Sequence, residues 1–147
     1  MLPNIALGKP ATQSSTDYGG TPDKAVDGNT DGTYGGNSLS HTAFEANPWW
    51  QVDLGGSHQI ESIDVWNRTD CCTDRLKDYY VLVSDEPFAS TSLQDALAQP
   101  GVWSVHETGQ AGRPTSIAVG HGGRYVRVQL AGSNWLHMSE VQVRAPE

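Results

Sequence analysis

The stretch Trp49–Leu54 reads Trp-Trp-Gln-Val-Asp-Leu, and it decides the fold class. Trp50, Val52 and Leu54 fall on one face of an extended chain, and the polar residues between them fall on the other face. Such alternation predicts a half-buried β-strand whose tryptophan pair serves the core. The rest of the chain can then be searched for partner strands and for the turns that join them.

Short β-prone runs flank this strand, and turn residues separate them. We predict further strands at 60–66, 79–84, 102–107, 115–119, 124–130 and 136–144. One helix is predicted over 92–99 with Ser92 as its cap, and one helical turn over 21–26 with Thr21 as its cap. Many short strands with few helical residues indicate a single all-β domain over 1–147, a sandwich or a barrel.

The composition excludes several classes of partner. A net charge of −8 provides no basic stripe that could neutralise phosphates, so neither nucleic acid nor an anionic membrane surface is expected. No apolar run reaches the ~18 residues that a membrane-spanning helix needs. The first residues, Met1-Leu2-Pro3, lack the basic and apolar regions of a signal peptide. We therefore expect this chain to be one module of a longer secreted protein that has other domains.

Both cysteines lie side by side in a polar loop, 67–78, between two predicted strands. Neighbouring Cα atoms are ~3.8 Å apart, below the usual ~4.4–6.8 Å of a disulfide, so a Cys71–Cys72 bond would close a small strained ring. An oxidised pair would imply an oxidising compartment, and two free thiols are an equal alternative. Adjacent cysteines lack the ligand spacing of a zinc site.

The same loop holds a cluster of opposite charges, with Asp70 and Asp74 close to Arg68 and Arg75. One interpretation is a solvent-exposed ion-pair cluster, which contributes little to stability. In the other interpretation the carboxylates orient the guanidinium groups toward a ligand rich in acceptors, because arginine offers five donors and no acceptor. The adjacent hydroxyls of a neutral sugar suit such donors, and a disulfide beside them would offer an apolar surface to the sugar.

An oxygen-rich and glycine-rich segment, 27–37, begins Asp-Gly-Asn-Thr-Asp-Gly, like an EF-hand loop. The twelfth position, where an EF-hand needs a bidentate glutamate, is Ser38, so an EF-hand is excluded. A calcium loop of another kind and a solvated loop of Asx-turns are both open, and composition alone favours the solvated loop.

Catalysis finds weak support in the sequence. The chain contains no Gly-x-Ser-x-Gly elbow, no His-Glu-x-x-His motif and no phosphate-binding loop. A fucosidase or other sugar hydrolase would need two acids about 5–9.5 Å apart around the sugar, and sequence does not place such a pair. We therefore expect a binding domain and not an enzyme.

The charged loop and an upstream histidine form a spaced set: His41, 26 residues, Arg68-Thr69-Asp70, four residues, and Arg75. This set resembles the signature of the F-type, fucose-binding lectins, which often carry adjacent cysteines in this loop. Similar motifs cover nearly the whole chain at 4–15, 25–29, 49–55 and 139–143. These flanking motifs are shared with the wider discoidin-like, galactose-binding-like jelly rolls, so they indicate a β-sandwich jelly roll and not a particular ligand.

The resemblance implies a site for α-L-fucose. His41, Arg68 and Arg75 would donate hydrogen bonds to the ring oxygen and to the 3- and 4-hydroxyls of the sugar. Asp70 would hold these donors in place. We expect the three donors on the surface, where they contribute no core packing.

The resemblance also implies the apolar side of the site and its setting. A disulfide between Cys71 and Cys72 would pack on the sugar ring, and Tyr34 falls where the family tends to place an apolar residue near the fucose methyl. The loop 16–18 is expected to contact the rest of a glycan. The expected partners are fucosylated glycans, met by a secreted or extracellular protein.

One structural calcium ion is implied in addition. Its ligands would come from the early loop and from the last strand: the Lys24 carbonyl, Asp27, the Asn29 carbonyl, Ser38, the Ser139 carbonyl and Glu140. This favours the calcium interpretation of segment 27–37. Ser139 departs from some relatives that carry cysteine there, so a second disulfide is absent.

The prediction is therefore a lectin domain that recognises terminal α-L-fucose. The rival of a different class is a discoidin-type adhesion module, which binds protein or lipid through its loops. Such a module has no need of the set formed by His41, Arg68 and Arg75, and this set favours the lectin.

Overall fold

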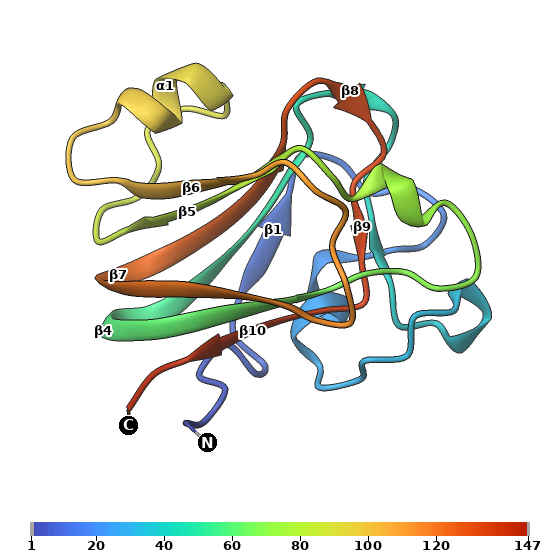
Figure 1. Cartoon of the computed structure of the whole chain (residues 1–147), viewed down its shortest axis with the longest axis horizontal. Helices are drawn as coiled ribbons and strands as arrows, with labels where there is room; N and C mark the ends of the chain where they lie inside the picture. The colour runs from blue at the N-terminus through green and yellow to red at the C-terminus, as the bar shows by residue number, and fades with distance from the viewer. Residues whose placement is uncertain (1, 147) are drawn as a thin grey trace.

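The computed structural model describes residues 2–146, so Met1 of the expected module start, and Glu147, lie outside it. Its centre is a six-stranded antiparallel sheet in the order β1-β4-β7-β5-β6, with β10 also paired to β4. The strands are β1 (Ala11–Gln13), β4 (Trp49–Trp66), β7 (Thr115–Leu130), β5 (Tyr79–Ser84), β6 (Trp103–Glu107) and β10 (Glu140–Arg144). Figure 1 shows this sheet on one side of the molecule and the remaining ladders and loops on the other.

Two short ladders lie on that other side. They are β2 (Ser40–His41) with β9 (His137–Met138), and β3 (Glu45–Ala46) with β8 (Ser133–Asn134). The helical pieces are η1 (Pro22–Val26), η2 (Tyr34–Gly36), η3 (Thr73–Arg75) and α1 (Leu93–Ala98). In Figure 1, β8, β9 and η3 come together at one end of the molecule, away from the chain termini.

The two central strands are longer than predicted, because each joins two predicted strands. The predicted strands 49–54 and 60–66 form β4, while 115–119 and 124–130 form β7. These strands pair along most of their lengths, with one register shift between Asp53 and His58 and a second between Ile60 and Ser62. Gly55 and Gly120, at φ +85° and +63°, take left-handed backbone conformations there, so the chain bends within the sheet where the sequence indicated a turn.

One face of the sheet carries the alternating apolar residues that the sequence predicted. Trp50, Val52 and Leu54 are at most 2% exposed. Strand β7 adds Val126, Val128 and Leu130 to this face. The face is covered by Ala25 and Val26 of η1, by Met138 of β9, and by Leu136 from the segment between β8 and β9. This packing of a sheet against a second layer of short ladders and loops confirms the predicted all-β sandwich.

The predicted helices differ in how they begin. The Ser92 hydroxyl accepts the Asp95 N–H at 3.3 Å at the start of α1, which confirms the predicted cap. The turn at η1 is a 3₁₀ helix, and the Thr21 side chain makes no capping bond, so that part of the prediction was wrong. No helix among residues 2–146 is long and apolar enough to cross a membrane.

Candidate functional site

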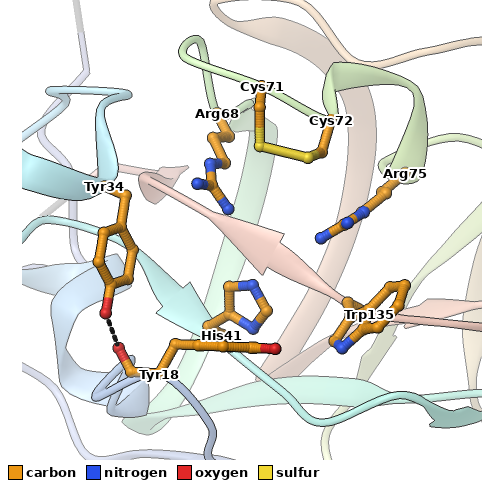
Figure 2. Close-up of a pocket in the computed structure, with 8 residues that line it drawn as sticks. All are labelled: Tyr18, Tyr34, His41, Arg68, Cys71, Cys72, Arg75 and Trp135. Atoms are coloured by element: carbon orange, nitrogen blue, oxygen red, sulfur yellow. Dashed lines mark hydrogen bonds between the residues drawn. A yellow bond between two sulfur atoms is a disulfide. The ribbon is translucent and has the colours of Figure 1, made fainter.

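An open pocket of about 280 Å³ lies at the end of the molecule where β8, β9 and η3 meet. Figure 2 shows its lining: Tyr18, Tyr34, His41, Arg68, Cys71, Cys72, Arg75 and Trp135. Six of these residues belong to the set that the sequence predicted for sugar binding. Tyr18 belongs to the loop expected to contact the rest of a glycan, and Trp135 was missed.

The loop 67–78 leaves the end of β4 and is held from its base. The Asn67 side chain is buried, and its amide donates to the carbonyls of Thr73 and Ala111, both at 2.9 Å. One asparagine therefore ties the loop both to itself and to a neighbouring segment. This fixes the backbone from which Arg68 and Arg75 project into the pocket.

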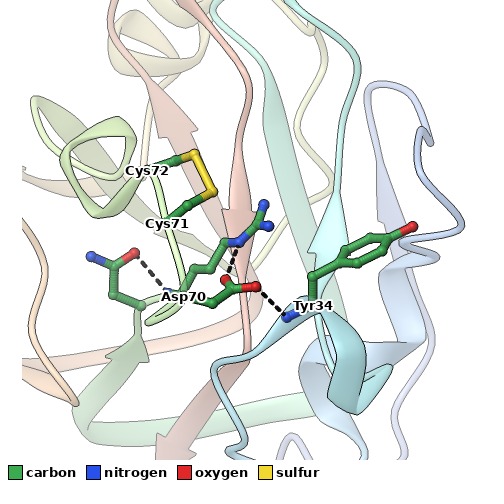
Figure 3. The surroundings of a disulfide bond; sticks show 6 residues. Tyr34, Asp70, Cys71 and Cys72 are labelled. Atoms are coloured by element: carbon green, nitrogen blue, oxygen red, sulfur yellow. Dashed lines mark hydrogen bonds and ion pairs between the residues drawn. A yellow bond between two sulfur atoms is a disulfide. The ribbon is translucent and has the colours of Figure 1, made fainter.

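Asp70 orients Arg68, one of the three donors that it was predicted to hold. Its Oδ1 accepts the Arg68 Nε–H at 2.6 Å, and its Oδ2 accepts the backbone N–H of Tyr34 at 3.1 Å (Figure 3). The hydrogen bond from Arg68, followed by that from Tyr34, lowers the pKa of Asp70 to about 2. Asp70 is thus ionised at neutral pH and leaves the outer nitrogens of Arg68 free to reach a ligand.

The adjacent cysteines are joined by a disulfide, which decides between the two alternatives that the sequence left open. Figure 2 shows the bond between Arg68 and Arg75 on the loop, and Figure 3 shows it near Asp70. Cys72 has a left-handed backbone, φ 60°, and serves as the N-terminal cap residue of η3. The disulfide therefore presents a small apolar surface to the pocket between two donors.

Arg75 is held by an aromatic ring and not by a carboxylate. Its guanidinium carbon lies 4.2 Å from the centre of the Trp135 ring. Trp135 follows β8, sixty positions further along the chain, and the β3–β8 and β2–β9 pairings on either side bring it to the pocket. No alternation or spacing in the sequence marks it, which is why sequence reasoning did not find this residue.

His41 is buried, at 2% exposure, and not on the surface as expected. Its ring packs between Tyr18 at 4.9 Å and His137 at 5.1 Å, because β2 and β9 place the two histidines opposite each other. Gly20 lies tightly against its Cβ and backbone, where a side chain would not fit. His41 therefore contributes to packing as well as to the pocket.

The hydrogen bond of His41 also fixes its chemistry. Nδ1–H donates to the Thr42 carbonyl at 2.7 Å, since a carbonyl can only accept. Burial lowers the pKa of His41 below its ordinary value. In the neutral ring Nε2 is then an acceptor, whereas the family resemblance implied that His41 donates.

Of the residues predicted to hold calcium, Asp27 lies close to Glu140 at the start of β10, and Ser139 directly precedes it. Glu140 is fully buried, its Oε2 accepts the Gly28 N–H at 2.9 Å, and its Oε1 has no partner. Burial, with a smaller contribution from nearby Asp27, raises the pKa of Glu140 to about 8. A buried carboxylate oxygen without a partner, beside a second carboxylate, fits a hard cation such as calcium.

The other predicted calcium ligands would contribute neutral oxygens, from hydroxyl or backbone carbonyl groups. Ser38 is buried with its hydroxyl on the Asp31 carbonyl, and Ser139 is buried with its hydroxyl 3.3 Å from the Trp66 carbonyl. The Lys24 ammonium is engaged elsewhere, and the Asn29 N–H bonds to Asp27 at 3.0 Å. Within residues 2–146 no three His, Cys, Asp or Glu side chains gather as a metal site, so carbonyl and hydroxyl oxygens would have to complete this one.

Comparison with known proteins identifies relatives of this chain. A family model described as a NedA-like, galactose-binding domain matches residues 24–128. Fucolectin-5 of Anguilla japonica is 34% identical over 149 residues, which cover 97% of this chain and 76% of that protein.

Solved structures extend the likeness to three dimensions. A Streptococcus pneumoniae fucose binding module, SpX-3, has a TM-score of 0.85 at 33% identity, and the match covers 99% of this chain and 100% of that one. The lectin domain of lectinolysin, solved in complex with the Lewis b antigen, has a TM-score of 0.83 at 36% identity, covering 98% and 97%. The chain therefore belongs to the F-type lectin, or fucolectin, family of galactose-binding-like β-sandwich domains.

Proposed function

We propose that this domain binds terminal α-L-fucose of glycans in the pocket that holds His41, Arg68 and Arg75. One observation carries the proposal: in a member of the F-type lectin family, two guanidinium groups and a buried imidazole converge on one open pocket beside a disulfide. The names of the relatives, fucolectins and a fucose binding module, support this ligand class.

The polar groups suit a pair of adjacent hydroxyls. Arg68 and Arg75 donate, and a hydroxyl that accepts from a guanidinium donates its own proton to Nε2 of His41. Hydrogen bonds to charged donors contribute about 1.5–3 kcal/mol each. This chain from guanidinium to hydroxyl to imidazole replaces the donor role that the resemblance gave to His41.

The apolar groups suit the rest of the sugar. The Cys71–Cys72 disulfide would pack on the C–H groups of the ring. Tyr34, which lines the pocket and whose N–H is bound by Asp70, would cover the methyl of a 6-deoxy sugar. Fucose has about eleven heavy atoms. At about 0.4 kcal/mol per atom, binding is near −4.5 kcal/mol, a sub-millimolar affinity.

The direct test is calorimetric titration with L-fucose, with D-glucose as the control sugar, followed by a glycan array. We expect sub-millimolar binding of fucose and none of glucose, because glucose lacks both the methyl and the axial hydroxyl. Equal binding of the two sugars would refute the fucose assignment. Absence of fucosylated glycans among the array hits would refute the lectin assignment.

We also propose that calcium binds at Asp27 and Glu140 and joins the loop 27–37 to the last strand. The carbonyls of Lys24, Asn29 and Ser139 and the hydroxyl of Ser38 would complete the ligand set. When bound, calcium supplies charge that compensates the buried Glu140 carboxylate. It takes no part in contact with the sugar.

Chelation tests the calcium proposal through stability. A ligand that binds only the folded state raises its stability, by about 2.7 kcal/mol at a hundredfold excess over Kd. Adding a chelator should therefore lower the melting temperature, and Glu140→Gln should remove this response. Unchanged melting together with no calcium in metal analysis would disprove the site.

A binding role accounts for the pocket better than hydrolysis or adhesion. The lining residues within the described chain include no carboxylate, whereas glycoside hydrolysis requires a pair of them. A discoidin-type module that binds protein or lipid does not require two arginines and an imidazole in one pocket. The disulfide is typical of an oxidising compartment, so we place the domain in a secreted or extracellular protein.

A further inference from the structure

A second pocket, of about 210 Å³, lies where the end of β1, the strand β3 and the start of β4 meet the segment that precedes α1. It shares no lining residue with the pocket that holds the two arginines. Its lining is formed by Ser14, Glu45, Ala46, Asn47, Trp49 and Thr91. This lining contains one carboxylate and no cationic side chain, so its chemistry is the reverse of that in the first pocket.

The Glu45 carboxylate is held in a fixed direction. Its Oε2 accepts the hydroxyl of Ser14 at 3.0 Å and also that of Ser15. Each serine oxygen is fixed in turn, because Ser14 accepts the Trp49 N–H at 3.1 Å and Ser15 accepts the Ala43 N–H at 2.9 Å. The other carboxylate oxygen, Oε1, makes no hydrogen bond within residues 2–146. It is therefore oriented and available to a donor from outside.

Two walls of this pocket are tied together by one buried side chain. The Gln129 Nε2 group donates to the carbonyl of Asn47 and to the carbonyl of Thr91, both at 2.9 Å. Asn47 comes from the turn between β3 and β4, whereas Thr91 comes from the segment before α1. The pocket is thus formed before a ligand arrives, and binding requires little ordering.

Glu45 lacks a counter-charge in the part of the chain that the structure describes. It is half-buried and belongs to none of the ion pairs there. The guanidinium carbon of Arg127 lies 4.9 Å from the centre of the Trp49 ring, but Arg127 is 2% exposed and donates to Gln51 and Ser90. A half-buried carboxylate without a partner, in a chain of net charge −8, favours a cation from solution.

We propose that this second pocket binds a primary ammonium group. The ammonium donates to Oε1 of Glu45 and to the Thr91 hydroxyl, since it carries three donors and no acceptor. The carbon atoms next to it pack on the Trp49 ring, and tryptophan is the ring that attracts cations most strongly. A lysine side chain and an amino sugar both present this group. The site does not depend on the proposed fucose pocket.

The experiment follows the indole N–H signal of Trp49 by nuclear magnetic resonance, with Trp49→Phe to assign it. The probes are Nα-acetyl-L-lysine methylamide and D-glucosamine, in a slightly acidic buffer that keeps both amines protonated. Their uncharged counterparts are Nα-acetyl-L-norleucine methylamide and N-acetyl-D-glucosamine. We expect a saturable shift with at least one amine and none with the uncharged compounds, and the amine that binds more tightly identifies the source. No shift with either amine, or equal shifts with the uncharged compounds, would overturn the site.

Two variants test the pocket itself. Glu45→Gln removes the charge but keeps an acceptor for the serines, and it should raise the Kd of the better amine about tenfold. Ala46→Leu leaves Glu45 in place and fills the pocket, so it should abolish the shift. Melting temperatures near that of the parent show that both variants fold. Parent-like binding in Ala46→Leu, or in a folded Glu45→Gln, would overturn the proposal.

Glu61→Gln is the matched control, because Glu61 is an exposed acid of β4 that lines neither pocket. It should bind the amine as the parent does, and an equal loss there would reduce the effect of Glu45 to net charge and overturn the site. Arg75→Ala should also bind the amine normally. Loss of amine binding in Arg75→Ala would place the amine in the first pocket and overturn the second site, whereas a failure of fucose binding alone leaves the second site standing.

Discussion

Arg68 and Arg75 are held in different ways, so a mutation can disturb the position of one and leave the other unchanged. Arg68 depends on the Asp70 carboxylate at 2.6 Å, whereas Arg75 lies against the Trp135 ring at 4.2 Å. A carboxylate fixes the direction of one N–H group, while a ring fixes only the plane of the guanidinium. Loss of Asp70 should therefore disturb Arg68 and leave Arg75 in place.

Removal of either guanidinium should abolish measurable binding of L-fucose. Arg68→Ala and Arg75→Ala each lose hydrogen bonds of about 1.5–3 kcal/mol, most of what a sub-millimolar ligand has available. Arg75→Lys should fail as well, because an ammonium reproduces neither the fork nor the stacking on Trp135. Calorimetry measures the effect, and undiminished affinity in both alanine variants would refute the site.

His41→Ala should differ from the arginine variants by losing stability as well as binding. The His41 ring is 2% exposed and packs against Tyr18 and His137. Its removal leaves a cavity, which should lower the free energy of unfolding by about 2–3 kcal/mol. The melting temperature of His41→Ala should therefore fall by several degrees, whereas Arg75→Ala melts close to the parent. Equal melting temperatures would contradict the buried position of this ring.

At the scale of elements, the pocket depends on two loops that dock on each other. The Thr69 N–H donates to the Gly32 carbonyl at 2.8 Å, which joins the loop 67–78 to the loop 27–37. Arg113 bridges the same junction, donating to the Asn67 carbonyl at 2.5 Å on one side and to the Thr30 carbonyl on the other. The position of Arg68 thus depends on a glycine more than thirty positions earlier.

Gly32→Ala should therefore weaken fucose binding about tenfold without touching the pocket. A methyl group at Gly32 would lie 2.5 Å from Cγ2 of Thr69, so the loop must move by a distance that hydrogen bonds to a sugar do not tolerate. The double variant Gly32→Ala/Thr69→Ala removes both close atoms of Thr69 and leaves only the end of the flexible Arg113 side chain at 2.7 Å, so it should recover part of the affinity. Gly109→Ala, with no atom within 4 Å of the added methyl, is the control and should bind normally. No recovery in the double variant would refute this coupling.

Reduction of the disulfide should weaken binding while the fold survives. The Cys71–Cys72 bond joins neighbours, so it closes no long loop and contributes little to global stability. Its loss frees the loop tip and removes an apolar surface of the pocket. Titration before and after a mild reductant should show reduced affinity with unchanged circular dichroism. Two free thiols in the denatured, unreduced protein would contradict the bond.

Sequence reasoning found the strands and most of the pocket, for identifiable reasons. Alternation at Trp49–Leu54 reports local burial, and the spacing from His41 to Arg75 carries the family resemblance. Trp135 and the continuity of β4 were missed, because both depend on pairing between distant strands. The buried state of His41 was missed for the same reason, since it follows from the β2–β9 pairing.

For the molecule as a whole, two histidines facing each other make stability depend on pH. His137 is fully buried with both ring nitrogens unpartnered, and burial lowers its pKa from 6.5 to about 3. Between pH 6.5 and 3 the unfolded chain binds a proton that the folded chain excludes, so stability falls as pH falls through this range. His41, whose pKa is also lowered, acts in the same direction.

Acid should therefore destabilise the parent more than His137→Phe. The expected loss from His137 between pH 6.5 and 5 is about 2 kcal/mol, at about 1.4 kcal/mol per pH unit. Phenylalanine keeps an aromatic ring at the site and has no nitrogen to protonate, so the variant should retain its pH 7 melting temperature and lose less at pH 5. Thermal melts at the two pH values measure this, and identical losses would contradict the assignment.

The last strand, β10, covers the edge of the second half of β4. Strand β10 pairs with the second half of β4, and the Ile5 N–H bonds to the Val143 carbonyl at 2.9 Å, so the two ends of the chain close the structure together. During synthesis, β4 thus keeps that edge open until residues 140–144 have left the ribosome, and Glu140 reaches the early loop only then. A nascent chain can hold no finished sugar pocket, and the slow, long-range closure that completes it is the period in which this domain is most exposed to misassociation.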